Sequence, residues 1–101
     1  MALQVVFHWL AAKEARAAES WYANRSPEVA ERFRTAVHDS AQRIADNVAT
    51  HPVSESRFRY VRVYRFPYRL IYCVESESTA RVVAVSHFRR KPGYWRRRTS
   101  S

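Results

Sequence analysis

The chain has 101 residues, 47% of them hydrophobic, and a formal net charge of +9 at pH 7, which is the size and apolar content of one domain that folds without metal or disulfide support. A single cysteine excludes an intrachain disulfide, and a single glycine excludes the glycine-rich phosphate loops of nucleotide-binding enzymes. The four histidines are scattered and the apolar runs are short, so we expect no cofactor, no metal site and no membrane segment, and a cytoplasmic location.

The chain begins with a predicted strand and a predicted helix. The apolar run at residues 3–9 is typical of a short strand. Residues 10–24 are rich in alanine and place their apolar side chains at helical spacing, which predicts an amphipathic helix. We expect Trp9 and Trp21, together with Tyr22, to anchor this helix to the core.

A second helix starts at Ser26, Pro27 and Glu28. The hydroxyl caps free amides, proline suits the first helical position, and a carboxylate is favourable at the positive end of the helix dipole. The helix ends before Pro52 and carries one apolar stripe, formed by Val29, Phe33, Val37, Ile44 and Val48. The short connection between the two helices predicts an antiparallel hairpin.

After a polar loop at residues 54–56, the hydrophobic period changes from 3.6 to 2. This pattern predicts three strands, at residues 58–66, 69–75 and 81–88. Short connections favour antiparallel neighbours. The fold class is therefore α+β: an N-terminal strand, a helix hairpin and an antiparallel three-stranded meander, forming one sheet with the helices on one face. We expect a single domain over residues 1–101 that ends in a basic tail at residues 91–101.

A bend at Phe66 and Pro67 sets the expected register, in which Tyr64 is opposite Arg69 and Arg62 is opposite Ile71. The face that packs on the helices then consists of Val61, Val63, Leu70, Tyr72 and Val74. The opposite face presents Tyr60, Arg62, Tyr64 and Arg69. A slip of one residue would exchange the two faces.

The positive charge is concentrated in the second half of the chain. Residues 57–101 hold twelve of the eighteen basic side chains and two of the nine acidic ones, a local net charge of +10 against −1 for residues 1–56. Sixteen of the eighteen are arginine, which forks onto phosphate or carboxylate and stacks on aromatic rings. Candidate contacts to an RNA strand or an acidic partner are Tyr60, Tyr64, Arg65, Arg90, Lys91, Trp95 and Arg96. The alternative is a solvated basic face whose rings cover arginine stems.

His87 is the one imidazole in this basic region. Neighbouring arginines disfavour its charged form, so it is a candidate general base for attack of a ribose 2′-hydroxyl on the adjacent phosphate. Arginine would neutralise the charge that grows on the phosphate oxygens. The candidate catalytic set is Arg62, Arg69, His87, Arg89 and Tyr94. The alternative for His87 is a structural role at the end of its strand.

The order of elements and three sequence strings resemble the RelE/ParE superfamily of bacterial toxin-antitoxin toxins. The strings are WYANRSPEVAERF at residues 21–33, FPYRLIYCVE at residues 66–75 and HFRRKPGYW at residues 87–95. The resemblance covers nearly the whole chain. It implies a growth-inhibiting toxin of a type II (plasmid stabilisation) system in the bacterial cytoplasm, neutralised by a small antitoxin that wraps an acidic segment around it.

The resemblance also implies two possible targets. RelE-type members cleave mRNA on the ribosome, and Arg62, Arg69 and Arg89 fall where those enzymes place basic residues. They tend to carry a C-terminal tyrosine, where this chain aligns Trp95 with Tyr94 beside it. ParE-type members inhibit DNA gyrase and need no catalytic set. Three interpretations therefore stay open: a metal-independent, ribosome-dependent endoribonuclease, a gyrase inhibitor, and a non-toxic basic RNA-binding or degenerate relative.

Overall fold

The computed structural model describes residues 3–99, so the last two residues of the predicted tail lie outside the described residues. The elements in chain order are β1 (Gln4–Phe7), α1 (Trp9–Ala23), α2 (Pro27–Asp46), β2 (Val53–Glu55), β3 (Phe58–Val63), β4 (Tyr68–Ser76), β5 (Thr79–His87) and the short 3-10 helix η1 (Arg96–Arg98). Five strands form one sheet in the order β1-β5-β4-β3-β2. β1 is parallel to β5, and the other pairs are antiparallel. The predicted α+β class is confirmed.

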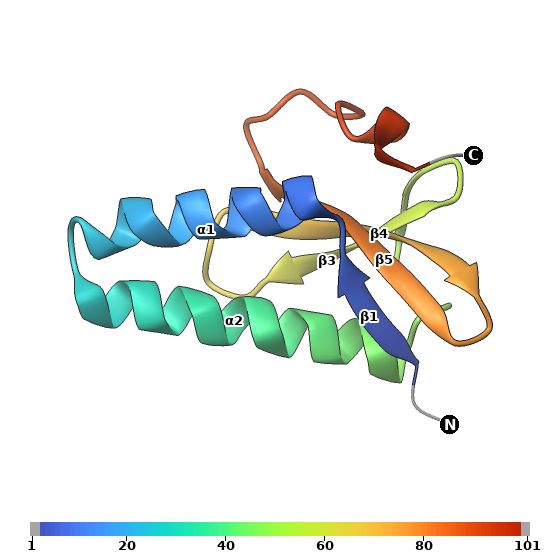
Figure 1. Cartoon of the computed structure of the whole chain (residues 1–101), viewed down its shortest axis with the longest axis horizontal. Helices are drawn as coiled ribbons and strands as arrows, with labels where there is room; N and C mark the ends of the chain where they lie inside the picture. The colour runs from blue at the N-terminus through green and yellow to red at the C-terminus, as the bar shows by residue number, and fades with distance from the viewer. Residues whose placement is uncertain (1–2, 100–101) are drawn as a thin grey trace.

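Figure 1 shows α1 and α2 side by side in front of the sheet, with the C-terminal segment crossing the top of the view. The hairpin connection forms as predicted, because the Ser26 hydroxyl accepts a hydrogen bond from the amide of Val29 at 3.4 Å and Pro27 is the first residue of α2. At the start of α1, Nδ1 of His8 accepts from the amide of Leu10 at 3.0 Å. Both helices therefore begin at a side chain that satisfies free amides.

The core between the helices and the sheet contains an aromatic cluster. Phe33 of α2 is 1% exposed, and its ring lies 5.1 Å from Phe66 and 5.4 Å from Tyr68, measured between centroids. Tyr22 of α1 joins them, 5.3 Å from Phe33. The prediction that Trp9 and Trp21 anchor α1 is wrong, because their exposed fractions are 67% and 52%. Alanines and Tyr22 supply the buried side of α1 instead.

The sheet has a core on each face. The helix side buries Val61, Val63, Leu70, Tyr72, Val82 and Val85, and the opposite side buries Phe58, Ile71, Cys73, Val83 and Ala84. Both β4 and β5 contribute to the two cores, and the β4–β5 register shifts at residue 83: Tyr72 pairs with Val82, whereas Ile71 pairs with Ala84. An extra residue in one strand reverses the side on which the following residues point. Val74, expected on the helix face, is 46% exposed.

The tail folds back over the second face of the sheet. Gly93 has φ +87°, a left-handed conformation that favours glycine, and it turns the chain so that Trp95 reaches the sheet. Trp95 is 2% exposed and lies 6.4 Å from Phe58 between ring centroids. Arg96 forms an ion pair with Glu55 on β2, and this contact holds the C-terminal tail against the edge strand of the sheet.

The β3–β4 register differs from the prediction by two residues. Arg62 is opposite Arg69, and Tyr60 is opposite Ile71. β3 ends three residues earlier than expected, at Val63, because residues 64–67 form a four-residue turn in which Arg65 has φ +71°. The short strand β2 was predicted to be loop, since three residues show no period.

Candidate functional site

Arg62 and Arg69 are direct partners across β3 and β4, and both guanidinium groups lie against the ring of Phe88. The distance from guanidinium carbon to ring centroid is 5.2 Å for Arg62 and 4.9 Å for Arg69. Arg69 also lies 5.0 Å from the ring of Tyr60. An aromatic face attracts cations, so Phe88, the first residue after β5, holds two like charges close together.

The β3–β4 turn extends this surface. Tyr64 is 62% exposed, and the guanidinium of Arg65 lies 5.4 Å from its ring centroid. We define the arginine-aromatic surface as Tyr60, Arg62, Tyr64, Arg65, Arg69 and Phe88. Over residues 3–99, none of its three arginines forms an ion pair with a carboxylate. Their charges are therefore free to meet an anionic partner.

Helix α2 fixes the strand beneath Arg62. The guanidinium of Arg43 donates to the backbone carbonyl of Arg62 at 2.6 Å and to the hydroxyl of Ser40 at 2.9 Å. Ser40 is fully buried and donates to the carbonyl of Ala36. Because these bonds bind neutral acceptors, Arg43 positions β3 while it keeps its own positive charge.

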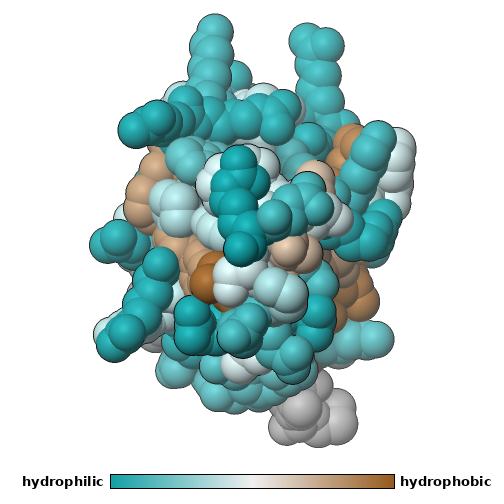
Figure 2. Space-filling view, turned by 90° about the vertical axis from the view of Figure 1, so that its left-hand side faces the viewer, coloured by the Kyte–Doolittle hydropathy of each residue, from teal (hydrophilic) through white to brown (hydrophobic). Residues whose placement is uncertain are grey.

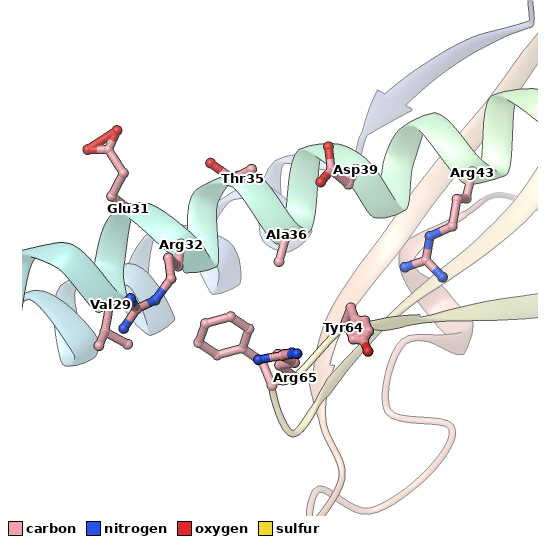
Figure 3. A pocket seen from close by; sticks show the side chains of 10 residues that line it. Val29, Glu31, Arg32, Thr35, Ala36, Asp39, Arg43, Tyr64 and Arg65 are labelled. Carbon is pink, nitrogen blue, oxygen red and sulfur yellow. The ribbon is translucent and has the colours of Figure 1, made fainter.

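Two adjoining hollows border the surface. One, of about 1020 Å³, lies between α2 and the β3–β4 turn, and the other, of about 670 Å³, contains Arg62 and Phe88. Figure 3 shows the side chains of Arg32, Arg43 and Arg65 pointing into the first hollow, whereas Glu31 points away from it. Asp39 also lines this hollow. Figure 2 shows the end of the molecule that includes this turn, where long hydrophilic side chains project and small hydrophobic areas lie between them.

His87 does not join the arginine pair. It lines a separate hollow of about 500 Å³ with Trp21 of α1, and its ring lies 5.0 Å from Tyr68, on the helix side of the sheet. Arg69 points to the opposite side. Side chains alternate along β4, so Arg69 lies on the same side as Ile71, whereas Leu70 faces the helices. The extra residue at position 83 causes this separation. Nδ1 of His87 also accepts a hydrogen bond from the amide of Arg89 at 3.0 Å, so this nitrogen is engaged.

The two aromatic residues of the tail are largely buried. Burial raises the pKa of Tyr94 above that of an exposed tyrosine. Its hydroxyl is enclosed near Ser86 and Glu14, but among the described residues no group meets hydrogen-bond geometry with it. Trp95 is a core residue, as its indole nitrogen is also buried. Neither side chain presents its polar atom to a substrate in this conformation, which corrects the surface role expected for Trp95.

Part of the basic tail is bound internally. Glu14 of α1 accepts from the amide of Val85 at 2.9 Å and from the guanidinium of Arg98 at 3.0 Å, and it forms an ion pair with Arg90 at 3.6 Å. Arg98 also donates to the carbonyl of Val83. Arg89, Lys91 and Arg97 are exposed. The predicted target-binding residues Arg90 and Arg96 are thus already in ion pairs with Glu14 and Glu55.

Comparison with known proteins agrees with this architecture. The family model for the ParE toxin of the type II toxin-antitoxin system parDE matches residues 5–92. The chain belongs to the ParE toxin family. This result confirms the resemblance predicted from the sequence, and the family implies an antitoxin partner. A search of curated proteins gave no match. Within the described residues, no helix is long and apolar enough to span a membrane.

Sequence reasoning missed two residues of the toxin that organise the site. Phe88 was taken as the end of a strand, and no local signal marks its role because its cation partners, Arg62 and Arg69, lie on other strands. Glu14 carried no signal, because nothing local distinguishes it from the other acidic residues of the helices. The strand β1 ends at Phe7, so it does not pair with β5 beyond Val82. The backbone amide of Val85 therefore needs another acceptor, and the carboxylate of Glu14 supplies it.

Proposed function

We propose that the toxin inhibits growth by binding DNA gyrase through the arginine-aromatic surface, together with the exposed cations Arg89, Lys91 and Arg97. Gyrase is the target that membership of the ParE-type branch implies. A rigid sheet that presents unpaired arginines beside exposed rings has the composition of a protein-binding hot spot. The positive field of a chain with net charge +9 would also speed encounter with an acidic partner.

The observation that carries this proposal is the separation of His87 from Arg62 and Arg69. Attack of a 2′-hydroxyl requires a base within hydrogen-bond reach of the hydroxyl and a cation beside the same phosphate. Here the imidazole and the arginine pair lie on opposite sides of the sheet. The hydroxyl of Tyr94 is buried and its pKa is raised, which makes it a poor substitute near neutral pH. The arrangement supports binding better than cleavage.

The same surface supports neutralisation by an antitoxin. Three arginines with no carboxylate partner among residues 3–99 would pair with the acidic segment that the superfamily resemblance implies. An antitoxin bound there would exclude the target by occupying the same donors. We therefore propose overlapping contacts, with Arg62 and Arg69 at their centre.

The test is inhibition of purified gyrase by the purified toxin in a DNA supercoiling assay. We expect inhibition by the native chain, its loss with Arg69→Gln, and its retention with Lys13→Gln, which removes an exposed cation of α1. Expressed in bacteria, the native toxin should give filamentous cells and a DNA damage response. Arrested translation with mRNA cut on the ribosome, and no effect on supercoiling, would establish the endoribonuclease interpretation instead. Normal growth at verified expression would support a non-toxic relative.

A further inference from the structure

We propose that the toxin itself binds single-stranded nucleic acid along a track that runs from Arg32 on α2, across the β3–β4 turn, to Arg62. This binding activity is additional to gyrase inhibition and does not rest on it. The two hollows that border the arginine-aromatic surface share four lining residues, namely Arg43, Tyr64, Arg65 and Phe66. They therefore form one continuous depression in which the turn is the midpoint.

The charges of the track suit a phosphodiester chain. Arg32, Arg43 and Arg65 point into the first hollow from its two walls (Figure 3), and Arg62 lines the second. Among the described residues, none of these four forms an ion pair with a carboxylate. Two carboxylates also line the first hollow: Glu31 is turned outward (Figure 3), and Asp39 lies on α2 between Arg32 and Arg43. The four arginines outnumber them. A single-stranded nucleic acid carries one negative charge per nucleotide, so its successive phosphates could each accept hydrogen bonds from a guanidinium group along this path.

The aromatic residues favour a nucleic acid over an acidic peptide. Tyr64 is 62% exposed and Phe88 is 38% exposed, and they lie at the turn and in the second hollow. An exposed ring next to an arginine is a platform on which an unpaired base stacks, whereas the bases of a duplex are already stacked on each other. Arg43 is held in place by its bond to the Arg62 carbonyl, so one of the phosphate donors is positioned in advance.

The backbone at the turn also fits this use. Arg65 has φ +71°, a conformation that non-glycine residues rarely adopt, and it places the Arg65 and Tyr64 side chains together at the exposed tip. Strained backbone of this kind is tolerated more often at binding sites than elsewhere. The track therefore combines separated cations, exposed rings and a fixed turn in one depression.

The experiment measures fluorescence anisotropy of a labelled twelve-nucleotide oligothymidylate with the full-length toxin over a range of salt concentrations. The double variant Arg32→Gln/Arg65→Gln should bind more weakly, and the slope of log affinity against log salt should decrease by about 0.7 for each phosphate that is no longer neutralised. Tyr64→Ala should weaken oligonucleotide binding roughly tenfold through loss of base stacking, with little effect on heparin, which has no bases. Melting temperatures close to the native value would show that both proteins are folded.

The matched control is Lys13→Gln/Arg16→Gln, which removes the same charge from exposed positions of α1 that line neither hollow. Equal weakening by the two double variants would overturn the track, because only total charge would then matter. Equal affinity for a duplex of the same length would overturn the preference for a single strand. Tighter binding of a polyglutamate peptide that depends on Arg32, which lies outside the surface proposed for the antitoxin, would identify the depression as a protein-binding groove and would also overturn the track.

Discussion

Arg62 and Arg69 are directly opposite each other on adjacent antiparallel strands, so two positive side chains share one face of the sheet. Like charges in this relationship destabilise a sheet. The Nε atom of Arg69 is in addition buried and has no hydrogen-bond partner among the described residues. Contacts with the ring of Phe88 offset part of this repulsion within the fold, and an anionic partner would use both groups.

Neutralising one member of the pair should therefore separate stability from activity. We expect Arg69→Gln to abolish growth inhibition and to change the free energy of unfolding by less than about 1 kcal/mol, because relief of the cross-strand repulsion offsets the loss of the Arg69 contacts with Phe88 and Tyr60. Urea denaturation and a plate assay of growth under induced expression measure the two effects. Lys13→Gln is the control for loss of one surface charge. A variant that loses activity only because it unfolds would contradict this account.

Phe88 should be replaceable by an aromatic residue and by no other kind. Its ring holds two guanidinium groups, and each exposed cation–π contact contributes about 0.5–1 kcal/mol. We expect Phe88→Leu to weaken gyrase inhibition several-fold and to lower the melting temperature by several degrees, and Phe88→Trp to retain both inhibition and stability. Concentrations for half-maximal inhibition of supercoiling provide the comparison. Equal potency of the leucine and tryptophan variants would show that the ring acts only as apolar surface.

The elements were predictable because the hydrophobic period is strong. The change from a helical stripe to alternation after Pro52 located the hairpin and three of the strands within a few residues. The register was wrong by two residues, since the left-handed conformation of Arg65 lengthens the turn and has no sequence marker. A register shift of two residues preserves the face on which each side chain lies. Tyr60, Arg62 and Arg69 therefore lie on the predicted face although their cross-strand partners differ.

The site was less predictable because it depends on contacts that are distant in sequence. The extra residue at Val83 decides that His87 points to the helices and not to Arg69, and no local pattern marks it. Trp95 was aligned with surface tyrosines of related enzymes, yet it is buried because the tail folds over a second apolar face of the sheet. The uninterrupted apolar runs at residues 70–74 and 82–85 are typical of strands covered on both faces, but the prediction, which relied on alternation, did not use this signal.

Glu14 should contribute more to stability than an exposed acidic residue of the same helix. It joins α1, the β5 edge and the tail through Val85 and Arg98, and its side chain is 16% exposed. We expect Glu14→Ala to lower the free energy of unfolding by about 1–3 kcal/mol, because it leaves a buried amide and a partly buried guanidinium without their acceptor. Amide hydrogen exchange at Val85 should accelerate in parallel.

The matched control is Glu19→Ala, which removes an ion pair between half-exposed side chains of Glu19 and Arg34. An ion pair with so exposed a guanidinium contributes little to stability, so we expect a smaller loss than for Glu14→Ala. Unfolding in urea, followed by circular dichroism, measures both variants. If the two substitutions cost the same and Val85 exchange is unchanged, the carboxylate of Glu14 does not hold the edge of the sheet.

Stability should decrease as the pH rises above about 8. Burial raises the pKa of the Cys73 thiol and of the Tyr72 and Tyr94 hydroxyls, so these groups stay neutral in the folded chain at pH values where the unfolded chain has begun to ionise. A group with a raised folded pKa contributes its full stability below its unfolded pKa, and that contribution is lost as the pH rises towards the folded pKa. With unfolded values of about 8.5 for cysteine and 10 for tyrosine, the loss begins with Cys73.

Replacing the thiol should therefore remove the first part of this decline. Cys73→Ala should show a flatter profile of unfolding free energy between about pH 8 and 9.5, followed by the same decline as the native toxin. In the native toxin, alkylation of the thiol at about pH 8 should proceed only as fast as the core opens, because Cys73 is 1% exposed. Rapid alkylation without denaturant, or a native profile that is flat from about pH 7 to 9.5, would mean that this face of the sheet is open in solution and that the tail does not cover it.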